Sequence, residues 1–294
     1  MLKKKKIDEI AIIGPGLIGS SIALSAKKKK LVKRVIGIDT NLSNLKVALK
    51  IKALDKAYTK IDKNINKSSI IFVCTPVSMI PKLIKKTSAF INSNAIITDV
   101  GSVKNIFNSD FYNSIHLKEN FVPGHPIAGT EFSGAKHSMN ELFKNKWCLL
   151  TPEFSSKKNI NIIKKFWSSI GMSVALMSPS DHDKVMSITS HLPHLIAFTI
   201  VEMAVKYNNK VKKDLMKFSA GGFRDFTRIA SSDPTMWKDI FIKNKSNMTE
   251  IIDLFIKSLL EFKLLISNED SAKISNLIKN SKQVRKKIIS LKQN

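Results

Sequence analysis

Short runs of β-branched and other apolar residues alternate with segments of helical periodicity from Glu9 to about Met177. This alternation is typical of strand–helix–strand units whose strands form a parallel sheet. It predicts strands at Glu9–Ile13, Arg34–Asp39, Ser69–Cys74, Ala95–Val100, Phe121–Pro123, Trp147–Leu150 and Met172–Leu176.

Beyond residue 178 the strand pattern ends, and apolar residues recur at helical spacing. The segment Ser178-Pro179-Ser180-Asp181 has the residues of a chain break and a helix N-cap, and Asp233-Pro234 has those of a helix start. Pro193 marks a kink or a boundary. The pattern therefore predicts an α/β parallel-sheet domain over residues 1–178 and an all-α domain over residues 179–294. The predicted helices cover residues 181–207, 211–222, 234–267 and 270–290.

The length of 294 residues agrees with two domains that each bury a core. The formal net charge of +26 raises the question of a nucleic-acid partner, but only four of the 49 basic residues are Arg. Phosphate and base recognition favours Arg and stacking aromatic residues, and aromatic residues make up only 7% of the chain. Lys, Ile and Asn are the residues that AT-rich codons encode. We therefore attribute the charge to codon composition and expect no nucleic-acid partner.

The two cysteines, Cys74 and Cys148, lack the spacing of a metal site, so we expect a reducing compartment and no metal. The basic segment Met1–Lys6 resembles the start of a signal peptide, but Asp8 and Glu9 interrupt the apolar run that follows. No run of about 18 or more uncharged apolar residues occurs, which argues against a membrane-spanning helix. We expect a cytoplasmic protein.

A glycine-rich turn follows the first predicted strand directly. Gly14, Gly16 and Gly19 form a GxGxxG pattern, in which Leu17 and Ile18 begin the next helix. The first glycine permits a tight turn, the second lets a pyrophosphate approach the backbone, and the third permits close helix packing. This context predicts a Rossmann-type dinucleotide-binding domain.

Asp39 ends the second predicted strand, twenty residues after Gly19. A carboxylate at this place can accept hydrogen bonds from the ribose hydroxyls, and it repels the additional phosphate of NADP. We therefore predict NAD as the cofactor. Thr75 and Pro76 close a later strand at the same sheet edge and are further candidate cofactor contacts.

His125 follows a short apolar strand and is expected at the carboxyl edge of the sheet, where ligands of such folds bind. An imidazole, with an ordinary pKa of about 6.5, can take a proton from a substrate hydroxyl as hydride leaves the same carbon. A purely structural histidine is the alternative. Ser102 ends another strand at this edge, where its hydroxyl either orients His125 and the substrate or caps a helix.

Arg224 and Arg228 stand one helical turn apart in a chain that otherwise uses Lys almost everywhere. This choice favours planar, bidentate recognition of a carboxylate, although a solvated helix face would show the same spacing. Of the six histidines, His182, His191 and His194 fall close to the domain junction, where a polar, cleft-facing helix start is favoured over a metal site.

Five motifs together resemble those of the prephenate/arogenate dehydrogenase family, and they run over nearly the whole chain. The last three are far more specific than the glycine pattern. They are Gly14-Pro15-Gly16-Leu17-Ile18-Gly19-Ser20, Asp99-Val100-Gly101-Ser102-Val103-Lys104, His125-Pro126-Ile127-Ala128-Gly129-Thr130-Glu131, Ser190-His191-Leu192-Pro193-His194 and Gly221-Gly222-Phe223-Arg224-Asp225-Phe226-Thr227-Arg228.

The resemblance implies oxidative decarboxylation in tyrosine biosynthesis: prephenate gives 4-hydroxyphenylpyruvate, CO2 and NADH, or arogenate gives tyrosine. It implies that His125 takes or holds the hydroxyl proton and that Ser102 orients it. Arg228 would hold the ring carboxylate. Loss of the ring carboxylate makes the ring aromatic, which drives the reaction.

The resemblance also implies that Ser190 and His194 lie near the substrate and that Glu131 and Arg224 pair across the cleft as a gate. The position of Arg224 is often Lys in relatives, which changes the geometry of such a gate. A homodimer through the helical domain is implied as well.

Other interpretations compete with this one. A 3-hydroxyacid-type dehydrogenase would need a catalytic Lys in the first helix after the junction, but Ser187–Val205 contains none. A non-catalytic NAD-binding or nucleic-acid-binding protein is favoured only by the charge.

Overall fold

The computed structural model describes residues 6–115, 118–211 and 215–290. The chain forms two compact units, Met1–Asn244 and Lys245–Asn294. The domain division predicted after residue 178 stays a prediction. Residues 1–5, which carry most of the signal-like basic segment, lie outside the described residues.

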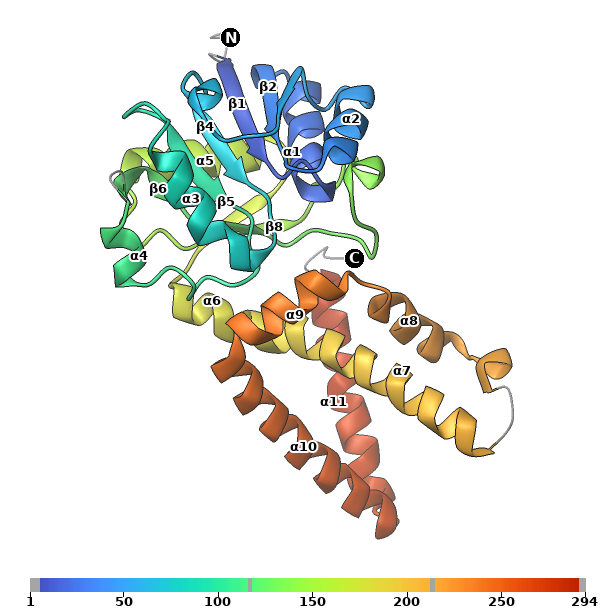
Figure 1. The fold of residues 1–294 in the computed structure, drawn as a ribbon. Coiled ribbons are helices and arrows are strands. Elements are labelled where there is room, and N and C mark those ends of the chain that lie inside the picture. Colours follow the sequence, from blue (N-terminus) through green and yellow to red (C-terminus); the bar gives the residue numbers. More distant parts are fainter. Residues whose placement is uncertain (1–5, 116–117, 212–214, 291–294) are drawn as a thin grey trace. The chain divides into compact units, whose positions relative to one another are not determined.

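The first unit begins with a six-stranded sheet in the order β3-β2-β1-β4-β5-β6, in which every pairing is parallel (Figure 1). Ile13 is in register with Ile38 on one side and with Val73 on the other. The carboxyl ends of the three central strands therefore lie at one edge. The strands are β1 (Ile7–Ile13), β2 (Val32–Ile38), β3 (Lys56–Tyr58), β4 (Ile70–Val73), β5 (Ile96–Asp99) and β6 (Phe121–Val122).

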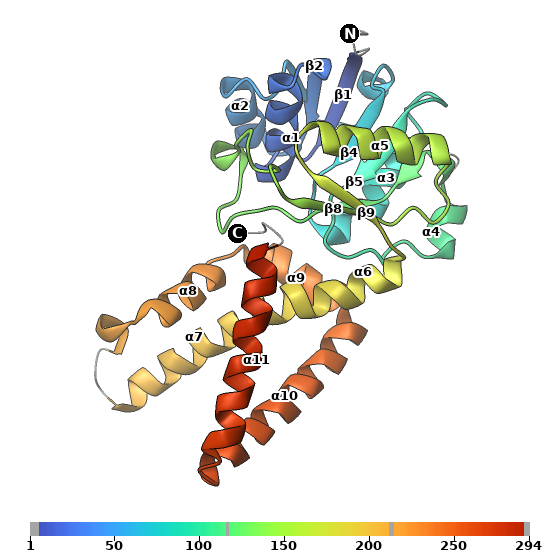
Figure 2. The same cartoon turned by 180° about the vertical axis from the view of Figure 1, so that it is seen from behind.

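Both faces of this sheet are covered, which explains why its central strands are nearly continuous apolar runs. On one face Phe72 packs edge-on against Trp167 of α5, with ring centroids 5.9 Å apart. On the other face Ile71 shares a buried cluster with Ile80 of α3. Figures 1 and 2 show α3 and α5 on opposite faces of the sheet. The helices of this part are α1 (Leu17–Lys28), α2 (Leu42–Lys50), α3 (Ile80–Ser88), α4 (Ser109–Asn113) and α5 (Lys157–Ser169).

The structure confirms the Rossmann-type fold but differs from the predicted strands in two places. The strand predicted at Phe121–Pro123 ends at Val122, and the chain continues as β7 (Gly124–Pro126) in a separate three-stranded sheet with β8 (Trp147–Leu150) and β9 (Ser173–Leu176). His125 thus lies within a strand. The short edge strand β3 was not predicted, because it contains only three residues and none of them is fully buried.

The helical part of the first unit starts with a continuous helical segment. It consists of α6 (Pro179–Met186), a five-residue π-helical stretch η5 (Ser187–His191) and α7 (Leu192–Val211). Pro193 lies in the first turn of α7, so it does not end the segment.

The next predicted helix, over 211–222, is only partly within the described residues. The described chain there forms a short 3-10 turn, η6 (Leu215–Phe218), and the helix α8 covers Gly221–Ala230 instead. The two glycines, which disfavour helix interiors, lie at the start of α8. The single helix predicted over 234–267 is divided at Asn244 into α9 (Pro234–Lys243) and α10.

The segment Pro179–Asn208 contains an 18-residue window with a mean hydropathy of 1.3, so it is long and apolar enough to cross a membrane by length and composition. This corrects the prediction that the chain has no candidate for a membrane-spanning helix, because a window can be apolar on average without being an unbroken run of apolar residues. Its first turns carry fully buried His182, Asp183 and His191, which contact protein groups. Such a segment is weak evidence for membrane insertion, since helices of soluble folds meet the same criterion.

The second unit is a pair of helices, α10 (Lys245–Ser267) and α11 (Ser271–Ser290). Large apolar residues stay exposed along both. These are Leu254, Ile256, Leu259, Leu260, Leu264, Ile266, Leu277, Ile278, Val284, Ile288 and Ile289. An apolar surface of this kind is typical of a helical pair that packs against another chain.

Candidate active site

The glycine-rich turn has the backbone that the motif predicts. Gly14 has a φ of +81°, and a Cβ atom at this residue would lie 2.6 Å from the carbonyl oxygen of Cys74. A Cβ atom at Gly19 would lie 2.6 Å from the Gly14 carbonyl oxygen. Both positions therefore require glycine for the fold itself, because no other side chain fits.

Gly16 is different, because a Cβ atom there would meet nothing within 4 Å. It is the N-cap of α1, where no side chain accepts a hydrogen bond and the first turn carries no acidic residue. Leu17 is buried and Ile18 partly buried, which fixes the direction of this turn. A helix N-terminus with an open approach fits an anionic group such as a pyrophosphate. The residues present therefore fit a dinucleotide.

Asp39 follows β2 at the same edge and is held in place by its neighbours. One carboxylate oxygen accepts a hydrogen bond from the backbone N–H of Asn41 at 2.9 Å, and the other accepts one from the Asn44 side-chain amide at 3.3 Å. Thr75 also lies beside the glycine turn, since its methyl group would be 2.9 Å from a Cβ atom on Gly14. Pro76, the next residue, is exposed. The predicted cofactor residues thus meet at one edge of the sheet.

A buried ion pair organises the next loop along this edge. Lys104 and Asp99 are both fully buried, and the Lys104 ammonium donates to Asp99 Oδ2 at 2.6 Å and to the Gly124 carbonyl at 2.5 Å. Asp99 also accepts from the backbone N–H groups of Gly101 and Gly124. Burial lowers the pKa of Lys104, an effect that the Asp99 carboxylate opposes. The pair therefore fixes both the loop that carries Ser102 and the start of the strand that carries His125.

His125 forms a hydrogen-bonded chain with two residues of α6. Its Nδ1 lies 2.9 Å from Nε2 of His182, and Nδ1 of His182 lies 2.7 Å from Oδ1 of Asp183. His182 and Asp183 are fully buried, whereas His125 is only partly buried. Asp183 also accepts the backbone N–H groups of Lys104 and Asn105, each at 2.8 Å. The first turns of α6 are thereby anchored to the loop after β5.

This chain determines the tautomer of His125. An ionised Asp183 only accepts hydrogen bonds, so Nδ1 of His182 carries a proton and Nε2 of His182 is an acceptor. Nδ1 of His125 must then donate to it, which leaves Nε2 of His125 unprotonated. Burial lowers the pKa of His125 well below its ordinary value, and the neighbouring His182 and Lys104 lower it further. The pKa is thus below the ordinary value expected from the sequence, and the ring is a neutral base at pH 7.

The π-helical stretch η5 brings a second group of histidines to this region. Such stretches change the direction of side chains within a helix and are frequent at functional sites. His191 is fully buried and lies 3.1 Å from the Asn244 side-chain amide, and burial lowers its pKa to about 4. Nδ1–H of His194 donates a hydrogen bond to the Ser190 carbonyl, 3.0 Å away, and the ring stacks on Trp237 at 3.8 Å between ring centroids.

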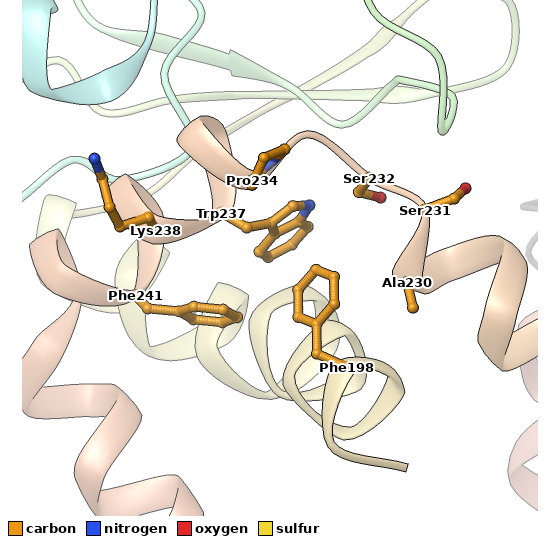
Figure 3. A pocket seen from close by; sticks show the side chains of 8 residues that line it. All are labelled: Phe198, Ala230, Ser231, Ser232, Pro234, Trp237, Lys238 and Phe241. Atoms are coloured by element: carbon orange, nitrogen blue, oxygen red, sulfur yellow. The ribbon is translucent and has the colours of Figure 1, made fainter. Parts of the chain in front are cut away.

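Trp237 lines a cavity of about 460 Å³ between α7, α8 and α9. Figure 3 shows the rings of Trp237, Phe198 and Phe241 facing one another, with the loop that follows α8 on the opposite side. The walls are largely aromatic, and two serines add hydroxyl groups. The lining residues are Phe198, Ala230, Ser231, Ser232, Pro234, Trp237, Lys238 and Phe241.

Among the described residues, no hydrogen bond or ion pair joins the other predicted site residues to His125. Ser102 lies on the fixed loop and is partly buried. Arg228 is exposed on α8 and lies 3.4 Å from Asp225, while Arg224 lies 3.4 Å from the Ser219 carbonyl. Glu131, in the loop after β7, is partly buried. No described ion pair joins Glu131 to Arg224, so the gate stays a prediction, as do the roles of these residues.

Two parts of the site were not anticipated from the sequence. Lys104 was recognised only as part of a motif and His182 only as part of a polar helix start, and Asp183 was not identified. The single sequence signal for His182 and Asp183 was the Asp181-His182-Asp183 run just after residue 178. Within residues 6–115, 118–211 and 215–290 no group of three His, Cys, Asp or Glu side chains could hold a metal ion.

Comparison with known proteins identifies the family to which the chain belongs. Two family models match the chain: the nucleotide-binding domain of prephenate dehydrogenase over residues 22–176 and the dimerization domain of prephenate dehydrogenase over residues 178–280. The chain belongs to the prephenate dehydrogenase family. This confirms the resemblance seen in the five sequence motifs.

Individual members of the prephenate dehydrogenase family are similar over most of their length. The Bacillus subtilis prephenate dehydrogenase is 32% identical, over 95% of this chain and 75% of that protein. The Zymomonas mobilis cyclohexadienyl dehydrogenase is 33% identical, over 94% of each. The structure of Aquifex aeolicus prephenate dehydrogenase with hydroxyphenyl propionate and NAD+ superposes with a TM-score of 0.90 at 36% identity, over 97% of this chain and all of that one.

Proposed function

We propose that this protein is a cytoplasmic, NAD-dependent dehydrogenase that converts prephenate to 4-hydroxyphenylpyruvate, CO2 and NADH in tyrosine biosynthesis. The observation that carries the proposal is the hydrogen-bonded chain from Asp183 through His182 to His125. It leaves one base nitrogen of His125 available at the edge of the sheet where the glycine turn and Asp39 lie. A base beside a dinucleotide site is the arrangement that oxidation of an alcohol carbon requires.

The cofactor residues are those of the glycine turn and its neighbours. The open N-terminus of α1 at Gly16 receives the pyrophosphate, and the Asp39 carboxylate binds the ribose hydroxyls and disfavours NADP. When bound, NAD accepts the hydride from the ring carbon that bears the hydroxyl. The full set is Gly14, Gly16, Leu17, Ile18, Gly19, Asp39, Thr75 and Pro76.

His125 acts on the substrate hydroxyl. Its Nε2 accepts the hydroxyl proton while hydride leaves the same carbon, and the new imidazolium keeps its Nδ1–H on His182. The bond between the ring and its carboxylate then breaks, CO2 leaves, and the electron pair makes the ring aromatic. The ring oxygen takes the proton back from His125. The reaction as a whole releases no proton, because the proton that His125 accepts from the hydroxyl is transferred back to the ring oxygen.

The remaining predicted residues hold the substrate. Arg228 binds the ring carboxylate, for which a planar guanidinium supplies two parallel hydrogen bonds. Ser190 and His194 lie beside the side chain of the substrate, and Ser102 orients His125 and the hydroxyl. Arg224 and Glu131 pair across the cleft. Exposure of both arginines on α8 supports this proposal, because an exposed guanidinium can exchange its local contact, at 3.4 Å in each case, for a ligand.

Arogenate is the second candidate substrate, since it differs from prephenate only in having an amino group in place of the side-chain keto group. The structure of Synechocystis arogenate dehydrogenase superposes with a TM-score of 0.78 at 26% identity, over 95% of this chain and 99% of that one. The same base and carboxylate contacts serve both substrates, and the product would then be tyrosine.

The proposed partners are this small molecule and a second copy of the chain, with neither a nucleic acid nor a membrane. The exposed apolar side chains of α10 and α11 support a homodimer, as does the match to a dimerization domain. Light scattering of the purified protein tests this: a mass of twice 32.9 kDa is expected, and a monomer would contradict it.

The direct test of the function is product formation by the purified protein with NAD and either prephenate or arogenate. We expect NADH and CO2 in equal amounts with at least one of the two. Comparison of the two rates assigns the substrate. Absence of turnover with both, in protein that is folded and binds NAD, would contradict the proposed reaction.

A further inference from the structure

A hydrogen-bonded contact joins the cofactor edge of the sheet to the helix that forms the aromatic cavity. Asp239 on α9 accepts hydrogen bonds through Oδ2 from the backbone N–H of Ser78, at 3.2 Å, and from the Ser78 hydroxyl. Ser78 belongs to the short 3-10 turn η2 (Val77–Met79). The two residues are 161 positions apart in the chain, so the contact is purely tertiary.

The carboxylate end of the contact is largely shielded from water, while Ser78 is exposed. Asp239 is 8% exposed, and it lies beside an apolar cluster formed by Val77 and Val103 from the sheet domain and Trp237 and Ile240 from α9. Hydrogen bonds to a carboxylate in such surroundings are stronger than those at a surface. No described ion pair includes Asp239. Its carboxylate is therefore held in this contact by hydrogen bonds from Ser78 and not by a cation.

Each end of the contact is close to a different ligand site. Ser78 follows Thr75 and Pro76, and the Pro76 carbonyl accepts the backbone N–H of Met79 at 3.0 Å, so these residues move as one turn. Asp239 follows Trp237, which lines the cavity and stacks on His194. A displacement of α9 must therefore shift the turn beside the glycine loop, and the converse also holds.

We infer that Asp239 is a positioning residue whose hydrogen bonds to Ser78 couple the binding of NAD to the binding of the aromatic substrate. The inference rests on the proposed function for the identity of the two ligands. Each ligand orders its own end of the contact, so the second ligand meets a protein that the first has already ordered in part. Such coupling is reciprocal and amounts to about 5–150-fold in affinity when it is established for two sites.

The coupling factor is measured by calorimetry, without turnover, as the ratio of the NAD dissociation constants in the absence and presence of hydroxyphenyl propionate. We expect a factor of about five or more for the wild-type protein. Asp239→Asn removes the charge at similar volume and is expected to bring the factor below about two, with the NAD affinity in the absence of the analogue nearly unchanged. Ser78→Ala, which removes the hydroxyl donor, is expected to act in the same direction.

Asp233→Asn is the matched control, because it makes the same chemical change on the same helix. Asp233 caps α9 through the Met236 N–H, and Asn serves equally well as a cap. This variant should keep the wild-type coupling factor. The double variant Ser78→Ala/Asp239→Asn should lose no more coupling than Asp239→Asn alone, because both changes act on one contact.

An unchanged coupling factor in Asp239→Asn, or its absence in the wild-type protein, would overturn the inference. So would a lower melting temperature and a uniformly weaker binding of both ligands at the wild-type coupling factor, since those effects indicate a structural role. If Asp239→Asn does not fold, Ser78→Ala decides in the same way. Because the coupling factor is measured without turnover, it can be interpreted even if the proposed reaction does not occur. Loss of coupling likewise does not contradict the proposed reaction.

Discussion

His182 accepts a hydrogen bond from His125 and does not donate one to it; Nε2 of His182 lies 2.9 Å from Nδ1 of His125. The direction follows from Asp183, which accepts a hydrogen bond from the other nitrogen of His182 and two more from backbone N–H groups. The reactive nitrogen of His125 is therefore set by residues that do not touch the substrate. This arrangement has the logic of a base that is oriented by a third group.

Replacement of His182 by Asn tests this relationship through pH dependence. His125 is active when neutral, so kcat/KM falls only below its depressed pKa, and the acid limb of the wild-type profile is expected below pH 6.5. His182 contributes to that depression, so the His182→Asn variant should have a smaller kcat and an acid limb shifted to higher pH. His137→Asn, on the loop that follows β7, is the control. An unshifted acid limb would contradict the assignment.

Gly16→Ala separates binding from folding in the glycine turn. The added Cβ atom meets no protein atom, so the melting temperature should stay close to that of the wild-type protein. The NAD affinity should fall, because the methyl group occupies the approach of the pyrophosphate. Gly14→Ala is the contrasting variant, expected to be destabilised by more than about 1 kcal/mol because of its positive φ. Unchanged NAD affinity in Gly16→Ala would place the pyrophosphate elsewhere.

Asp39→Ala addresses the choice of dinucleotide. Loss of the carboxylate removes both the ribose acceptor and the repulsion of the additional phosphate, so the ratio of kcat/KM with NAD to that with NADP should fall by about tenfold or more. Steady-state kinetics with both cofactors measures this ratio. Asp62→Ala, which removes an aspartate side chain that caps the 3-10 turn η1 (Lys63–Ile65), serves as the control. If the preference for NAD over NADP persists in Asp39→Ala, another group binds the ribose hydroxyls.

Arg228→Ala should raise KM about ten- to hundredfold, the effect of losing charge-assisted hydrogen bonds to a bound carboxylate. Arg285→Ala, which removes an exposed arginine from α11, is the control and should leave KM unchanged. The initial rates over a wide range of substrate concentration give both constants. A KM that stays constant in Arg228→Ala would mean that the carboxylate binds elsewhere.

The sequence predicted the parts of the site that depend on local chain geometry. The glycine turn and the acidic residue after β2 lie within about twenty residues of each other, and the histidine near the sheet edge follows from its place directly after a short apolar run. The correct fold class followed from the alternation of strands and helices, and its helical half from the change of periodicity after Ser178. These features depend on the order of residues along the chain, which is directly visible in the sequence.

The interactions that tune His125 could not be predicted, because they join distant segments. His182 lies 57 positions from His125, and Asp183 lies 79 positions from the Lys104 backbone that it binds. Charged residues such as Lys104 are rarely buried, so burial with Asp99 runs against the expectation from composition. The break after Val122, which places His125 in a second sheet, depends on pairing with β8 rather than on local propensity.

The central claim is that His125 is the base of an NAD-dependent oxidation, and His125→Asn tests it most directly. NADH formation with saturating substrate is compared between this variant and the wild-type protein, with NAD binding measured on the same samples. We predict a decrease in kcat of about 10²–10⁴-fold and nearly unchanged NAD affinity, as expected for loss of a positioned base. A rate close to that of the wild-type protein would contradict the claim.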